Sequence, residues 1–179
     1  QPAHIAELTC ETCLRAFPKA RAIFFLLAAA QGFKVECMQV RDDSSGSTNS
    51  QLIQSPRLIN RCLAERKGFL FLFEANQMQM IATQVMAVEK LDELEAGGDR
   101  IILCCPMFQH DTCYGFIEVE APLSARERQP LSRRDLSLAT VMAHLVAARL
   151  HELAQQGQRL ALARKATAGY LSATVGHCF

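Results

Sequence analysis

Residues 101–120, which read IILCCPMFQHDTCYGFIEVE, constrain the fold of this 179-residue chain more than any other stretch. Two apolar runs, 101–107 and 114–119, flank the short polar segment 109–113. Each run has the length and the β-branched, aromatic and thiol side chains of a strand, and the polar segment has the composition of a turn. Gly115 predicts a bulge or a close backbone approach just past the turn. The stretch therefore predicts a β-hairpin whose first strand is apolar enough to be covered on both faces.

The rest of the chain predicts helices and strands that can pack against this hairpin. The expected elements are a helix at 3–17, strands at 21–28, 34–41 and 69–73, a helix that begins at Ser55 and Pro56, and a long helix that begins at Ser132. Residues 74–94 are harder to assign, and their part 85–94 favours a helix after an irregular start. We predict an α/β (α+β) domain with a central antiparallel sheet of about five or six strands, flanking helices and a long C-terminal helix. The first and last helices should pack together on one face of the sheet.

The composition limits which partners the protein can bind. Half of the residues are apolar, which is enough for a sizeable core in one domain, and the formal net charge is +1. This charge gives no electrostatic footprint for nucleic acid or for an anionic membrane, so we expect neither partner. No apolar run approaches the roughly 20 residues that span a bilayer. Since the chain begins with Gln1 and not with Met, we expect a fragment of a longer protein.

The eight cysteines are spread along an apolar chain, which predicts buried small side chains more than a disulfide framework. We therefore expect a reducing, cytoplasmic setting, although the even count leaves an oxidising one open. Cys10 and Cys13 form a CxxC pattern, which in a cytoplasmic protein can be redox-active or half of a metal site. No second CxxC, HxxxH or CxxH supplies further ligands. We interpret the pair as two thiols on the buried face of the first helix, and we predict no metal site.

The long last helix has the pattern of a dimer interface. It starts with a capping-box-like arrangement of Ser132 and Asp135. Further along, its apolar residues alternate spacings of four and three, like the seam of a coiled coil. These seam residues are Val146, Leu150, Leu153, Gly157 and Leu160. Because residues 150–160 would overhang a domain of this size, we expect a homodimer through the first and last helices, with a sensor domain at 1–150 and a signalling helix at 151–179.

Five segments of the chain share a known pattern. They are the strand at 21–27, the helix start Ser55-Pro56-Arg57-Leu58, the strands at 101–106 and 114–119, and the helix LSRRDLSLATVMAHLVAARL at 131–150. Together they resemble a GAF domain, the small-molecule sensor module of bacterial and cyclic-nucleotide signalling proteins. The resemblance covers nearly all of residues 3–150. It implies a cytoplasmic sensory domain that binds a small molecule and relays the signal through a dimeric C-terminal helix to an output domain.

A second resemblance lies in residues 168–179, AGYLSATVGHCF. This segment is similar to the approach to the phosphoacceptor box of histidine kinases, where a His lies in a helix after small and apolar residues. The resemblance implies that His177 is the phosphorylated residue and that the output domain is a histidine kinase. The alternative is a tail with an incidental His. We predict no other catalytic residue in this chain.

The GAF resemblance implies a ligand pocket between the sheet and residues 74–94. Its candidate lining residues are Phe71, Phe73, Met78, Met80, Cys104 and Met107. Core packing explains each of these side chains equally well. Two GAF subclasses carry ligand residues that are missing here, namely the Cys-His pair of bilin-binding members and the Asn-Lys-Phe-Asp-Glu set of cyclic-nucleotide-binding members. The small-molecule ligand, and with it any cofactor, is therefore left unidentified.

Three alternatives stay open. Cys104, Cys105 and Cys113 share one hairpin with His110, and a thiolate near an imidazole can serve as a redox sensor or a metal ligand. However, neighbouring strand residues face opposite sides, so Cys104 and Cys105 cannot both face one pocket. The domain could also be a degenerate one that serves only in dimerisation. Some stand-alone GAF domains reduce free methionine sulfoxide, but their Ala-Cys-Asp-Ser segment is missing here, and we predict no intrinsic enzyme activity.

Overall fold

A computed structural model describes residues 1–41, 56–74, 77–80, 88–90, 99–124 and 129–176 of the chain. The helices are α1 (Pro2–Ala16), α2 (Pro56–Glu65) and α3 (Arg133–Gly176). The strands are β1 (Ala22–Ala29), β2 (Gly32–Val40), β3 (Phe69–Glu74), β4 (Gln77–Met80), β5 (Val88–Lys90), β6 (Arg100–Gln109) and β7 (Thr112–Pro122). This order of helices and strands follows the predicted one, apart from β4 and β5.

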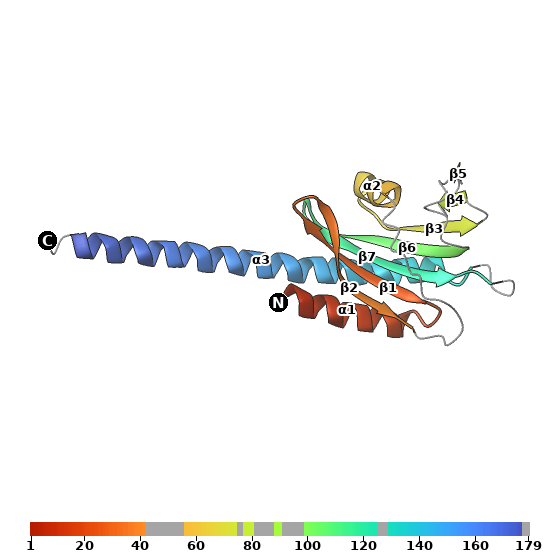
Figure 1. The fold of residues 1–179 in the computed structure, drawn as a ribbon, viewed down its shortest axis with the longest axis horizontal. Coiled ribbons are helices and arrows are strands. Elements are labelled where there is room, and N and C mark those ends of the chain that lie inside the picture. The colour runs from red at the N-terminus through yellow and green to blue at the C-terminus, as the bar shows by residue number, and fades with distance from the viewer. Residues whose placement is uncertain (42–55, 75–76, 81–87, 91–98, 125–128, 177–179) are drawn as a thin grey trace.

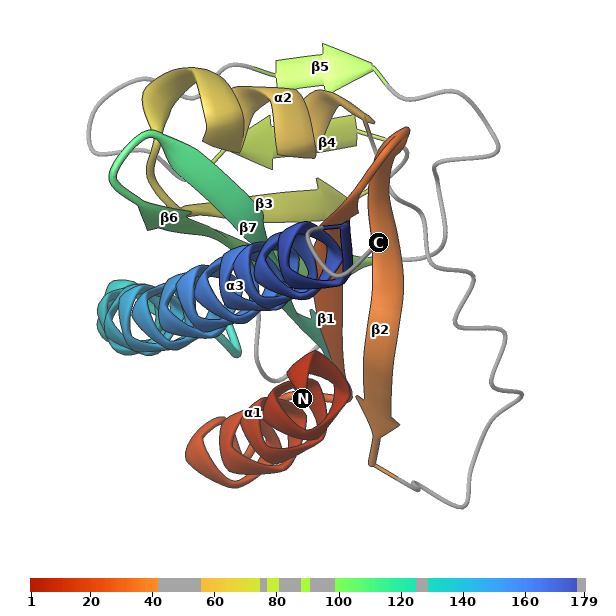
Figure 2. The same ribbon diagram turned by 90° about the vertical axis from the view of Figure 1, so that its left-hand side faces the viewer.

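Within the described residues, the strands form one seven-stranded antiparallel sheet in the order β2-β1-β7-β6-β3-β4-β5 (Figures 1 and 2). The predicted hairpin is β6–β7, and it lies in the interior of the sheet between β1 and β3. A strand in this position is covered on both faces, which explains the nearly continuous apolar run of β6. The predicted α+β fold class with a central antiparallel sheet is confirmed.

The described residues of the segment 74–94 include two short strands, one of which lies where a helix was predicted. Residues 77–80 read Gln-Met-Gln-Met, which alternates polar and apolar side chains with the period of a strand, and β4 pairs with β3 along this stretch. The helix predicted at 85–94 is wrong at Val88–Lys90, because these residues form the short strand β5 beside β4. The remaining residues of that prediction lie outside the described part of the chain.

The two faces of the sheet carry different helices (Figure 2). Helices α1 and α3 contact each other and cover one face, as predicted, and α2 covers the other. The α1/α3 face includes Phe25, Leu103 and Ile117, whereas the α2 face includes Phe24, Ile102 and Phe116. The strands supply the two hydrophobic cores with alternate residues, as the period of two requires.

Gly115 marks an irregularity in β7, as predicted. The pairing between β6 and β7 shifts register between Pro106 and Phe108, opposite Gly115. Gly115 has a φ of +153°, and a Cβ atom there would lie 1.9 Å from the carbonyl oxygen of Leu26 on β1. Only glycine tolerates this approach, so Gly115 lets β1 pair closely with the bulged strand.

Helix α3 begins at the predicted cap and extends well past the sheet (Figure 1). The backbone N–H and the hydroxyl of Ser132 both donate to Asp135 Oδ2, at 2.7 and 2.6 Å. Among the α3 residues whose side chains are described, Leu150 is the last that is buried. No helix in the described part of the chain is long and apolar enough to cross a membrane.

Candidate functional site

The predicted pocket residues divide between the two faces of the sheet. Phe71, Phe73 and Cys104 are buried on the α2 face. Met107 is buried on the opposite face, against the α1/α3 core, so its assignment to the same pocket is wrong. The reason is the alternation of β6, because Cys104 and Met107 are an odd number of residues apart. The side chains of Met78 and Met80 lie outside the described part of the structure, although both residues belong to β4.

The α2 face of the central strands also carries charged groups that sequence reasoning missed. Glu118 lies in the middle of β7, paired with Phe24 of β1 and with Cys104 of β6, and only 6 % of its surface is exposed. Two residues further along the same face, Glu120 Oε2 lies 4.0 Å from Nε of the buried Arg100. We call Phe24, Phe71, Phe73, Cys104, Phe116 and Glu118 the α2-side patch.

Helix α2 is in direct contact with this patch. Cys62 of α2 donates its thiol hydrogen to the carbonyl oxygen of Cys104 at 3.7 Å. Cys104 in turn donates to Glu118 Oε1 at 3.7 Å, which is the only hydrogen bond of the Glu118 side chain to a described residue. A thiol is a weak donor. The Glu118 carboxyl is therefore poorly compensated for its loss of water.

The surroundings of Glu118 favour its neutral form. Burial raises the pKa of Glu118 to about 7, and the nearby Glu120 carboxylate adds to the rise, while the Cys104 thiol opposes it. Burial also raises the pKa of Glu120 and lowers that of Arg100, so desolvation outweighs their mutual attraction. The Arg100 guanidinium stacks on the Phe73 ring, 4.7 Å from its centroid. The patch thus combines aromatic rings with a carboxyl that titrates near neutral pH.

The sequence itself contains a signal for the burial of Glu118. The strand Tyr-Gly-Phe-Ile-Glu-Val-Glu alternates, and its residues Phe116, Glu118 and Glu120 point to one face. Since β7 lies inside the sheet, an acidic residue in its middle has to be buried on one side. This inference requires knowing that the strand is central, which the hairpin alone does not establish.

The three thiols of the β6–β7 hairpin are separated rather than gathered. Cys104 is buried on the α2 face, Cys105 on the α1/α3 face, and Cys113 is half-buried near the tip of the hairpin. The pair Cys10 and Cys13 is buried on the inner face of α1, as predicted. No three His, Cys, Asp or Glu side chains come together as a metal site within the described residues. All cysteines outside the undescribed C-terminal end are free thiols.

We expect these thiols to react slowly while the protein is folded. Burial raises the pKa of Cys13 and of Cys105 to about 12, and it raises that of Cys10 further. Contact with the Cys62 thiol, together with burial, raises the pKa of Cys104. Because the thiolate is the reactive form, an aromatic disulfide reagent should label these four cysteines only after denaturation. Rapid native labelling of Cys104, mapped by mass spectrometry, would instead favour the thiol-sensor alternative.

No family model and no curated protein sequence matches this chain. Solved structures do resemble it. The phycocyanobilin-bound GAF domain of a cyanobacterial phytochrome superposes with a TM-score of 0.58 at 12 % identity, over 85 % of each chain. The GAF domain/HD domain protein of Geobacter sulfurreducens gives 0.59 at 13 % identity, over 86 % of this chain and 94 % of that one.

An enzyme has the same architecture. The type II free methionine-R-sulfoxide reductase of Thermoplasma acidophilum superposes with a TM-score of 0.54 at 12 % identity, over 85 % of this chain and 96 % of that one. Identities this low establish the fold alone. The chain has the GAF fold.

Proposed function

We propose that this chain is a cytoplasmic, non-enzymatic sensory domain that binds a small molecule on the α2 side of its sheet and relays the signal through α3. The observation that carries the proposal is the buried Glu118 carboxyl within an otherwise apolar and aromatic patch. A buried carboxyl whose only hydrogen bond to a described residue is a weak one costs folding free energy, so a ligand group that pairs with it is a reason for its presence. The free, buried cysteines support a reducing compartment.

The chemistry of the patch limits the class of ligand. Phe71 and Phe73 offer apolar contacts, and Glu118 offers a hydrogen-bond acceptor. We therefore propose an amphipathic ligand with an apolar body and an N–H or O–H donor. A phycocyanobilin occupies one structural neighbour, but the Cys-His pair that bilin-binding GAF domains share is missing from this sequence, so we do not propose a covalently attached bilin.

The assembly that we propose is a homodimer through α3, with α1 alongside. Between Ser132 and Leu150, α3 is apolar on two opposite sides. Its inner side packs on the sheet through Ala139, Ala143 and Ala147. Its outer side exposes Leu138, Val141 and Leu145, by 42, 56 and 67 %. An apolar stripe exposed to water on a helix that already packs on its sheet does not stabilise a monomer. Packing against α3 of a second copy would bury this stripe.

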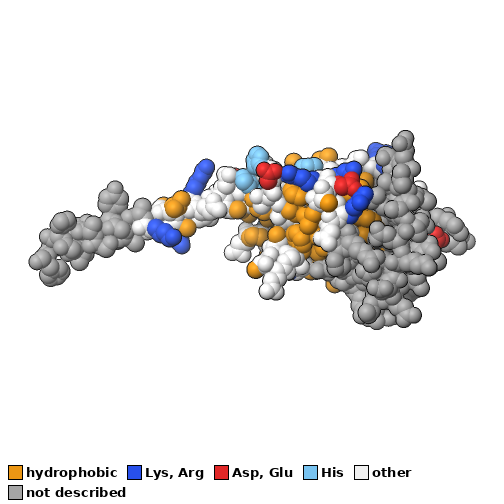
Figure 3. Space-filling model, turned by 90° about the horizontal axis from the view of Figure 1, so that it is seen from above, with side chains coloured by type: hydrophobic (Ala, Val, Ile, Leu, Met, Phe, Trp, Pro, Cys, Tyr) orange, Lys and Arg blue, Asp and Glu red, His pale blue; other side chains and the backbone are white. Residues whose placement is uncertain are grey.

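The overhanging part of α3 supports an output role. Leu160 and Leu162 are exposed by 62 and 66 %, and Figure 3 shows apolar and basic side chains together on this part of the helix. We propose that residues 151–179 lead into an output module, with a histidine kinase as the candidate. His177, the proposed phosphoacceptor, lies outside the described residues.

The proposal is tested by looking for a bound small molecule. We expect native mass spectrometry of the purified protein to show an added mass that denaturation releases. Glu118→Gln, which keeps the shape but removes the charge, should lower the bound fraction at least about tenfold, as expected for a charge-assisted hydrogen bond. The exposed Glu7→Gln is the matched control and should leave occupancy unchanged.

Two results would count against the sensory proposal. The first is a protein that carries no added mass and shows no thermal shift with a panel of amphipathic amines and alcohols, which would favour a dimerising spacer. The second is reduction of free methionine sulfoxide by the purified chain, which would favour an enzyme like the structural neighbour from Thermoplasma.

A further inference from the structure

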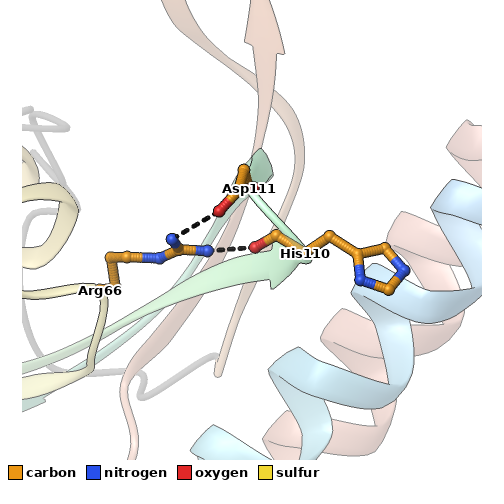
Figure 4. A network of polar contacts seen from close by, with 3 residues as sticks. All are labelled: Arg66, His110 and Asp111. Atoms are coloured by element: carbon orange, nitrogen blue, oxygen red, sulfur yellow. Dashed lines mark hydrogen bonds and ion pairs between the residues drawn. The ribbon is translucent and has the colours of Figure 1, made fainter.

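The tip of the β6–β7 hairpin is held from one side by Arg66, the residue that directly follows α2. The Arg66 guanidinium lies 2.8 Å from Asp111 Oδ1 through Nη1, and its Nη2 donates to the backbone carbonyl of His110 (Figure 4). The same guanidinium stacks over the Phe108 ring, 4.7 Å from its centroid. One side chain therefore makes three contacts with the tip, and the two polar ones form a planar fork that lysine cannot reproduce.

The other side of the tip is held by α3. His151 Nδ1 lies 2.7 Å from the Tyr114 hydroxyl, and the His151 ring meets the His110 ring edge to face at 5.5 Å between centroids. Figure 4 shows the two ends of His110, with its carbonyl toward Arg66 and its imidazole toward α3. Arg66 and His151 thus contact the same residue from opposite sides.

The backbone at both contacts is unusual. Arg66 and His110 each have a φ of 53°, in the left-handed region that costs a residue with a Cβ roughly 1 kcal/mol or more. Arg66 takes this conformation directly after α2. Gly68, two residues further on, permits a close approach to the sheet, because a Cβ there would lie 2.6 Å from Cys105 Sγ. Left-handed residues of this kind persist where surrounding contacts fix them.

Because of the position of His151, the contacts of the hairpin tip link α2 to the point where α3 leaves the domain. His151 directly follows Leu150, the last described α3 side chain that is buried, so it lies where the helix leaves the domain. The contacts that run from His151 through the hairpin tip to Arg66 lead back to α2, which packs on the α2-side patch through Cys62. A shift of α2 relative to the sheet would move Arg66 and with it the tip.

We propose that the hairpin tip, residues 108–114, couples α2 to the turn of α3 around His151, where this helix leaves the domain. A displacement of α2 is passed to α3 through Arg66, the His110–Asp111 turn and His151, without crossing the sheet. The biological use of this coupling rests on the proposed sensory function, but the coupling itself is a property of the ligand-free protein. Arg66 and His151 are positioning residues in this scheme.

Amide hydrogen exchange of the ligand-free protein tests the coupling. In Arg66→Met, which keeps an apolar stem but loses the fork, we expect exchange at residues 150–156 of α3 to rise about tenfold relative to β7 residues 117–119. The β7 amides report global unfolding, so the ratio isolates a local effect. Arg61→Met is the matched control, since it breaks the Arg61–Glu65 ion pair of the same helix without touching the tip, and it should leave the ratio unchanged.

Coupling between two sites is reciprocal, so the same measurement in the opposite direction provides the decisive test. His151→Ala should speed exchange at residues 62–65 of α2, which His151 does not touch, whereas the control His144→Ala on the outer surface of α3 should not. The proposal is overturned if each variant changes exchange only in its own helix and in the tip, or if all amides change equally. Because no ligand is added, such a failure leaves the ligand-binding experiment unaffected.

Discussion

Replacing Leu138 and Leu145 together by glutamate should convert a dimer into a folded monomer. Both side chains lie on the outer stripe of α3 and are 42 and 67 % exposed in the single chain, so glutamate there disturbs no contact with the chain's own sheet. In a dimer, two carboxylates per chain would have to leave water at a cost of several kcal/mol each. The dissociation constant should therefore rise at least about a thousandfold, which is roughly 4 kcal/mol. Sedimentation velocity at micromolar concentration measures the change.

The matched control places the same charges beside the stripe. Ser137→Glu with His144→Glu has the same seven-residue spacing on the same helix, one position away, and should remain dimeric with unchanged helix content. Leu150→Glu, by contrast, should unfold the domain, because Leu150 is buried against its own sheet. An unmodified protein that already sediments as a monomer with α3 ordered would contradict the assembly, and the signal would then need another route.

The α3 interface shows where sequence reasoning reaches its limit. The spacing of Val146, Leu150 and Leu153 was interpreted as a dimer seam, but Leu150 is buried in its own domain and Val146 packs against the same core. Spacing reveals that a helix has an apolar side and does not tell which neighbour covers it. The stripe at Leu138, Val141 and Leu145 has the same spacing and is left uncovered. Only the position of the sheet distinguishes the two.

Local signals were interpreted more successfully. The central hairpin, the bulge at Gly115 and the Ser132–Asp135 cap were predicted correctly, since each depends on a few neighbouring residues. Of the residues predicted to line one pocket, Phe71, Phe73 and Cys104 do lie on one face of the sheet. Strict alternation would have excluded Met107 from that face. Glu118 was missed because its burial depends on β1, which pairs with β7 but lies far away in the sequence.

Replacing Glu118 by glutamine should stabilise the ligand-free protein at pH 8 and change little at pH 5. The pKa of Glu118 is raised from 4.5 to about 7 on folding, so between these values the folded state binds more protons than the unfolded state. The contribution of Glu118 to the free energy of unfolding therefore falls by about 3 kcal/mol in total as the pH rises through that window. It stays low above pH 7. Glutamine cannot ionise and avoids this loss. For a domain of this size the midpoint of thermal unfolding at pH 8 should rise by roughly 6–12 °C.

The pH dependence separates ionisation of Glu118 from a simple change of packing. Glu7→Gln serves as the control, because Glu7 lies on the exposed side of α1 and should show no gain at either pH. An equal gain for Glu118→Gln at pH 5 and pH 8 would show that the amide merely packs better, and a loss at pH 8 would mean that the carboxylate is well compensated in the folded protein. The expected result has a functional corollary. If the folded domain is more stable without this carboxylate, while ligand occupancy falls about tenfold in the same variant, then Glu118 stabilises the complex at the expense of the free domain, as binding residues commonly do.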